Sequence, residues 1–77
     1  SLYKEIRVEF TRAEDAEAFD PPDSAAVRRE DRQVSFLYSG RADDLLRLLV
    51  RYGIENLWMD EPDLEKVFLH FYEKESE

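Results

Sequence analysis

Residues 2–11 read LYKEIRVEFT, and their side chains alternate between apolar and polar character along most of the stretch. Ile6, Val8 and Phe10 fall on one side of an extended chain, and the charged residues between them fall on the other. A period of two is typical of a strand with one face in the core and one face toward water. We therefore expect a half-buried strand here, and the remaining elements are placed around it.

A short helix is expected next, within the stretch of residues 12–20, which is rich in Ala and Glu. Thr11 precedes it and is a residue type that caps helix N-termini, so we assign it that role. The helix must end before residues 20–23, Asp-Pro-Pro-Asp, because proline cannot continue a helix.

Residues 25–38 predict a β-hairpin, in which Val34, Phe36 and Tyr38 alternate along the second arm. Glu30 and Asp31 lie near its turn. Since neither Gly nor Asn is present there, we expect a loop longer than the tight two-residue type.

The clearest helix covers residues 42–52, because its apolar residues are spaced by three and four positions. Gly53 is expected to end this helix in the left-handed conformation that a C-cap requires. The stripe that should pack on the sheet consists of Leu45, Leu48, Leu49 and Tyr52.

Residues 54–59 predict a short buried strand, and the acidic turn after it leads to a last helix with Pro62 near its start. We expect Leu64 and Phe68 to fix this helix to the core, with Phe68 deeply buried. The full apolar face is Leu64, Val67, Phe68 and Phe71.

The predicted order is strand, helix, strand, strand, helix, strand, helix, within a single domain over residues 1–77. This order predicts an α+β fold, the ferredoxin-like βαββαβ arrangement with an antiparallel sheet plus an added C-terminal helix. Because the chain opens directly on a strand at Ser1, we expect a fragment of a longer protein, with Ser1 a candidate cloning residue.

The composition argues against several functions. A net charge of −8 repels nucleic acid and anionic membrane surfaces, and the local basic spot of Arg28, Arg29 and Arg32 does not outweigh it. No cysteine is present to form a disulfide or a thiolate metal site. No apolar stretch is long enough for a membrane span, so direct membrane insertion is not expected.

The residues give no support for catalysis, a cofactor or a metal. His70 is the only histidine, and no cysteine accompanies it as a zinc ligand. The carboxylates gather in three clusters, at residues 14–17, 43–44 and 60–63, and none of the clusters has the spacing of a calcium loop. With only Gly40 and Gly53, the chain has no Gly-rich phosphate loop.

Three apolar residues lie off the predicted helix stripes: Leu46, Val50 and Leu69. Leu69 sits about 150° from the stripe of its helix at 100° per residue. Two explanations stay open, which are packing against a neighbouring helix and contact with a partner.

Residues 61–69, Glu-Pro-Asp-Leu-Glu-Lys-Val-Phe-Leu, resemble the closing motif of bacterial ABC-transporter ATP-binding subunits of the ABC-2-type exporter branch. Those subunits commonly end in Glu-Pro-Ser-Leu-Glu, an acidic and an aliphatic residue, and Phe-Leu. The resemblance covers roughly residues 40–72. Asp63 replaces the usual Ser or Thr, and Lys66 replaces the usual acid.

The resemblance implies a non-catalytic C-terminal interaction or regulatory domain, cytoplasmic, at the inner face of the cell membrane. Its implied partners are its own ATPase domain, the second ATPase subunit and the membrane permease subunit, with a homodimer also open. ATP and magnesium would bind in the upstream domain of the parent protein, not here. The candidate interaction residues are Glu61, Pro62, Glu65, Leu69, Leu46 and Val50.

Two functions of other classes remain open. A ferredoxin-like domain that senses a small molecule would show a polar-lined pocket at a dimer interface. A small stand-alone enzyme would show titratable groups that converge in a cleft.

Overall fold

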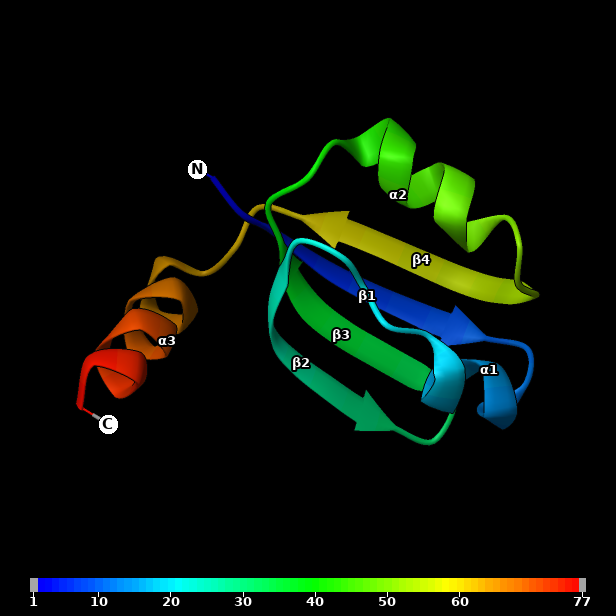
Figure 1. Cartoon of the computed structure of the whole chain (residues 1–77), viewed down its shortest axis with the longest axis horizontal. Coiled ribbons are helices and arrows are strands. Elements are labelled where there is room, and N and C mark those ends of the chain that lie inside the picture. The colour runs from blue at the N-terminus through cyan, green and yellow to red at the C-terminus, as the bar shows by residue number, and fades with distance from the viewer. Residues whose placement is uncertain (1, 77) are drawn as a thin grey trace.

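The computed structural model describes residues 2–76 of the chain. Its elements follow in the predicted order (Figure 1). They are β1 (Lys4–Phe10), α1 (Ala13–Ala18), β2 (Ser24–Glu30), β3 (Gln33–Tyr38), α2 (Ala42–Leu49), β4 (Ile54–Asp60) and α3 (Leu64–Ser76).

The four strands form one sheet in the order β2-β3-β1-β4, and every neighbouring pair is antiparallel. Val8 in the central strand β1 lies opposite Val34 of β3 and Leu57 of β4. Helices α1 and α2 lie on the same face of the sheet (Figure 1). This confirms the predicted α+β, ferredoxin-like arrangement with an added C-terminal helix.

The core lies between that covered face and the two helices. Alternate residues of β1 and β3 are fully buried in it, together with Phe19 after α1 and with Leu45 and Leu49 of α2. The aromatic ring of Phe10 packs against that of Phe19, with ring centroids 5.4 Å apart. The opposite, open face carries the polar residues of β1 that were expected there, which include Glu5 and Arg7.

The predicted caps of both short helices are wrong. Arg12 holds the N-cap position of α1 without a side-chain cap bond, and the Thr11 hydroxyl instead donates a hydrogen bond to Glu55 at 3.0 Å. Helix α2 ends at Leu49 rather than Tyr52, and Gly53 is not left-handed. Gly53 serves close approach, because a Cβ there would lie only 3.0 Å from the Thr11 hydroxyl oxygen.

The hairpin turn is also tighter than predicted. Glu30 pairs with Gln33, so only Asp31 and Arg32 form the loop. Asp31 takes a positive φ of 54°, which Asp tolerates better than most residues. The prediction failed because it counted only Gly and Asn as able to supply that conformation.

No helix described within residues 2–76 is both long and apolar enough to cross a membrane.

Candidate interaction surface

The segment that carries the family-like motif forms the start of α3. The Asp63 carboxylate accepts a hydrogen bond from the Glu65 backbone N–H at 2.9 Å, as an N-cap residue should. Pro62 precedes this cap and is half-buried. Glu61 pairs with Lys4 of β1 at 3.4 Å, so the turn is fixed to the sheet by one exposed ion pair.

Helix α3 approaches the open face of the sheet at one end of β1. The Lys66 ammonium pairs with Glu5 at 2.6 Å, and the ring of Phe71 packs edge-on against Tyr3, with centroids 6.0 Å apart. Leu37 points to this face and is nevertheless buried. Between helix and sheet lies an open hollow of about 410 Å³, lined among others by Leu69 and His70 of α3 and by Ala26, Arg28 and Leu37 of the hairpin.

The apolar stripe of α3 faces away from the sheet, which corrects the prediction that Leu64 and Phe68 fix the helix to the core. Leu64 is 77% exposed, Phe68 is 65% exposed and Tyr72 is 60% exposed. These residues follow one another at intervals of four and therefore lie on one side of the helix. The rings of Phe68 and Tyr72 stack with centroids 6.1 Å apart. We call this surface, Leu64, Phe68 and Tyr72, the α3 stripe.

The helix is turned so that a charged contact, rather than its apolar stripe, meets β1. Lys66 and His70, which face the sheet, lie on the other side of the helix from the α3 stripe. Burying the stripe here would place Leu and Phe against Glu5 and would break its charged contact with Lys66. The expected deep burial of Phe68 is thus wrong.

The predicted interaction residues fall into two separate groups. Glu61, Pro62, Glu65 and Leu69 surround the start of α3, where Leu69 is 44% exposed. Leu46 of α2 and Val50, the residue that caps its C-terminus, lie on the covered side of the sheet and are 44% and 78% exposed.

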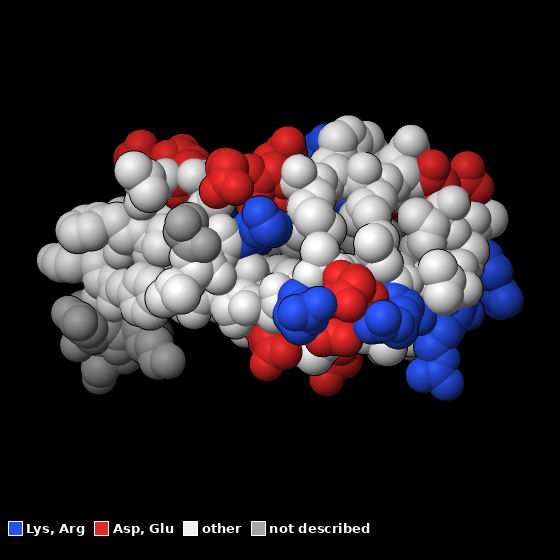
Figure 2. Space-filling model, turned by 90° about the horizontal axis from the view of Figure 1, so that it is seen from above, with Lys and Arg blue, Asp and Glu red and all other residues white. Residues whose placement is uncertain are grey.

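Leu46 and Val50 are thus both exposed among the described residues, and neither belongs to the buried core cluster. In Figure 2, the end of the molecule formed by α3 shows a continuous area of uncharged residues, drawn in white. Sequence periodicity grouped Leu64 and Phe68 on one apolar face but assigned that face to the core, and it missed Tyr72, which continues the i, i+4 series.

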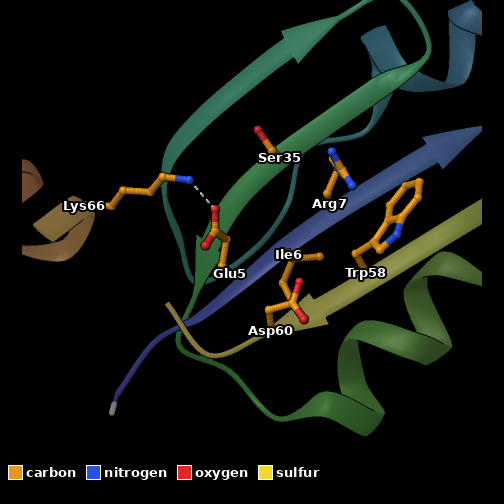
Figure 3. A pocket seen from close by; sticks show the side chains of 7 residues that line it. All are labelled: Glu5, Ile6, Arg7, Ser35, Trp58, Asp60 and Lys66. Atoms are coloured by element: carbon orange, nitrogen blue, oxygen red, sulfur yellow. Dashed lines mark hydrogen bonds and ion pairs between the residues drawn. The ribbon is translucent and has the colours of Figure 1, made fainter. Parts of the chain in front are cut away.

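Sequence reasoning missed a second feature, on the open face of the sheet. Arg7 lies over the indole ring of Trp58, 4.0 Å from the ring centroid, on the neighbouring strands β1 and β4 (Figure 3). They border an open hollow of about 340 Å³, which Ser35 and Asp60 also line. The alternation of residues 2–11 places Arg7 on the polar side of its strand, but Trp58 lies in a strand that was predicted to be buried.

This hollow does not contain a nucleophile with a base. Among the described residues, no hydrogen bond joins Ser35 to an acid or an imidazole, and Lys66 is occupied by Glu5 (Figure 3). The arrangement can hold a small polar group by charge and stacking.

Several members of the carboxylate clusters, Glu14, Asp43, Asp44 and Glu61, form surface ion pairs. Hydrogen bonding to Arg12 holds the pKa of Glu14 below its usual value, and hydrogen bonding to Arg41 does the same for the pKa of Asp43. In the part of the chain that the structure describes, no group of three or more His, Cys, Asp or Glu residues could hold a metal ion.

The basic spot predicted on the hairpin is dispersed. Arg29 donates a hydrogen bond to the Ala16 carbonyl at 2.6 Å, and Arg32 lies 3.9 Å from Glu9. Arg28 lines the hollow beneath α3. The three side chains thus point to different surroundings rather than forming one cationic patch.

Comparison with known proteins places the chain in no family: no family model matches it, and no curated protein or solved structure is significantly similar.

Proposed function

We propose that this chain is a non-catalytic interaction module, the C-terminal accessory domain of an ABC-transporter ATP-binding subunit. One observation carries the proposal. The stretch that resembles the closing motif of such subunits, residues 61–69, forms a capped helix whose apolar stripe is uncovered. A small domain gains nothing for its own stability from such a surface, so a partner is the simplest reason for it.

The chemistry beside the α3 stripe defines what the partner offers. Glu61, Asp63 and Glu65 give the start of α3 an acidic border, and all three are exposed. The partner surface should therefore combine an apolar groove, which takes Leu64 and Phe68, with a basic rim. A helix laid into a groove is a common mode of such contacts.

The proposed partners are the domain's own ATPase domain, the second ATPase subunit and the membrane permease subunit, at the inner face of the cell membrane. A contact that forms in only one state of the ATPase dimer would bias the equilibrium between open and closed states. ATP and magnesium would bind in the parent protein's upstream domain.

The test uses the full reading frame in which residues 1–77 lie. Its product should hydrolyse ATP, while the 77-residue chain shows no heat of binding with Mg-ATP in titration calorimetry. The double change Leu64→Ser and Phe68→Ser should uncouple or weaken the full-length assembly. Ala18→Ser, at an exposed residue of α1 on the covered side of the sheet, is the control and should have no effect. A reading frame without a nucleotide-binding domain would refute the proposal.

A second candidate function is the sensing of a small polar molecule, and the hollow beside Arg7 and Trp58 favours it. Its charged lining suits a ligand with one negative and one positive group, which would contact Arg7 and Asp60 respectively. Thermal-shift measurements with amino acids and small carboxylates would test it. The expected result is a higher Tm in the presence of the ligand, and Arg7→Ala should abolish this increase.

A further inference from the structure

The two edges of the sheet differ in how well they are protected against pairing with another strand. Along β2 the register shifts between Ala25 and Arg28, and Ala26 takes a positive φ of 53°. A bulge and charged side chains are common devices that stop an edge from adding strands. The β2 edge is thus closed to a regular partner.

The β4 edge lacks most of these devices. Among the described residues β4 has a single neighbour, β1, and its only register irregularity lies at its beginning, opposite Glu9 and Phe10. The strand contains no Lys, Arg, Pro or Gly, and its charges, Glu55 and Asp60, lie near its two ends. Unprotected, regular edges of this kind are templates for a further strand.

The backbone hydrogen bonds of β1 show which N–H and C=O groups of β4 point away from the sheet. The Phe10 N–H bonds to the Arg32 carbonyl on the β3 side, and the Thr11 N–H bonds to the Gly53 carbonyl on the β4 side. Because these directions alternate along a strand, Arg7 bonds toward its partner Trp58 in β4. The N–H and C=O groups of Leu57, the next residue in β4, therefore point outward.

Helix α2 adds apolar surface along the same edge. It runs over the covered face on the β4 side of the sheet, antiparallel to β4 (Figure 1). Leu46 and Val50 each follow a buried leucine by one position, which is 100° around a right-handed helix, and this rotation turns them toward the β4 edge. Seen onto this edge, uncharged surface extends along it between charged groups (Figure 2).

We propose that β4 pairs antiparallel with β4 of a second copy of this chain, around a twofold axis at Leu57. The two four-stranded sheets would then form one continuous sheet. Leu57 is the middle residue of Ile54–Asp60, so this register overlaps the whole strand. It sets Glu55 opposite Met59 of the second copy, so no two like charges face each other directly.

The charge of the chain gives this dimer a particular salt dependence. Two copies of net charge −8 repel each other, while backbone pairing and apolar contact attract them. Added salt screens the repulsion and leaves the attraction. The dimer should therefore strengthen as salt rises, the opposite of an association driven by opposite charges.

Site-specific cross-linking of the full 77-residue chain tests the arrangement, since the chain has no cysteine of its own. Asn56→Cys places thiols of the two copies about 8 Å apart, whereas Arg28→Cys on the far edge leaves them more than about 30 Å apart. A bismaleimide with a spacer of roughly 8–10 Å should trap a covalent dimer only from position 56. Trapping from position 28 instead, or from neither position, would overturn the proposal.

Substitution of two exposed valines tests the same edge without cross-linking. Val50→Lys should weaken dimerisation about tenfold or more in sedimentation equilibrium, whereas Val27→Lys on β2 should leave it unchanged. A dimer that survives Val50→Lys and gives no cross-link from position 56 would mean that another surface, such as the α3 stripe, pairs the copies. This proposal does not depend on the transporter assignment, so either can fail alone.

Discussion

Helices α2 and α3 carry similar apolar patterns in sequence but opposite fates in the structure. Leu45 and Leu49 of α2 are buried in the core, whereas Leu64 and Phe68 of α3 are mostly exposed. The difference lies in what each helix can reach. Helix α2 lies between two strands in sequence and covers the apolar face, but α3 follows β4 and meets the open face, where Lys66 pairs with Glu5. An apolar stripe thus predicts a helix, but its surroundings determine whether the stripe is covered.

The largest expected effect comes from truncating the covered stripe. Leu45→Ala should lower the free energy of unfolding by about 2–5 kcal/mol, because it leaves a cavity in the core. Phe68→Ala should change it by less than about 1 kcal/mol, as surface substitutions usually do. Urea unfolding followed by circular dichroism measures both. Equal losses for the two variants would remove the contrast between the helices.

A smaller effect is expected where the chain enters α2. Gly40 lies against the phenol ring of Tyr38, whose hydroxyl donates a hydrogen bond to the Arg41 carbonyl at 2.7 Å. Gly40→Ala would push a methyl group into that buried ring and should cost about 1–3 kcal/mol. Thermal unfolding of this variant should show a clear loss, whereas an unchanged Tm would mean that the entry to α2 is loosely packed.

The order of the helices and strands could be predicted from the sequence, but the orientation of α3 could not. Alternation in residues 2–11 predicts β1, and the leucine spacing predicts α2, because each element has one apolar side that is buried in the core. The N-cap role of Asp63 was likewise readable, since it depends only on local backbone groups. The orientation of α3 depends on long-range contacts such as Lys66 with Glu5, which no local pattern encodes.

Leu69 was recognised from the sequence as lying off the stripe, and it is 44% exposed, but the same reasoning placed the wrong side of α3 against the core. The hollow beside Arg7 and Trp58 could not be predicted, because it requires the register that sets β1 beside β4. Gly53 illustrates the same limit, since its need for a small residue comes from Thr11, far away in sequence.

A modest stabilisation is expected beneath α3. Ala26 lines the hollow there and holds a positive φ of 53°, a conformation that costs a residue with a Cβ roughly 1 kcal/mol. Ala26→Gly should relieve this cost and, after the added flexibility of the unfolded chain, raise the stability by at most about 1 kcal/mol. A clear destabilisation in urea unfolding would argue that the alanine methyl group packs under α3.

The smallest effect concerns the pH response of the polar face. Hydrogen bonds from Asn56 and Gln33 hold the pKa of Glu9 below its ordinary value. Because the folded pKa lies below the unfolded one, this contribution to stability is present above about pH 4.3 and is lost as the pH falls through the folded pKa. Asn56→Ala should raise the pKa of Glu9 in an NMR titration. An unmoved pKa would contradict the role of that hydrogen bond.

The accessibility of the α3 stripe is measured most directly by thiol labelling of the cysteine-free chain. We predict that the thiol introduced by Phe68→Cys reacts with a disulfide reagent nearly as fast in the folded chain as in denaturant. The thiol introduced by Leu49→Cys, on the covered stripe of α2, should be strongly protected under the same conditions. Protection at both positions would show that α3 buries its stripe, and the interaction surface proposed here would be contradicted.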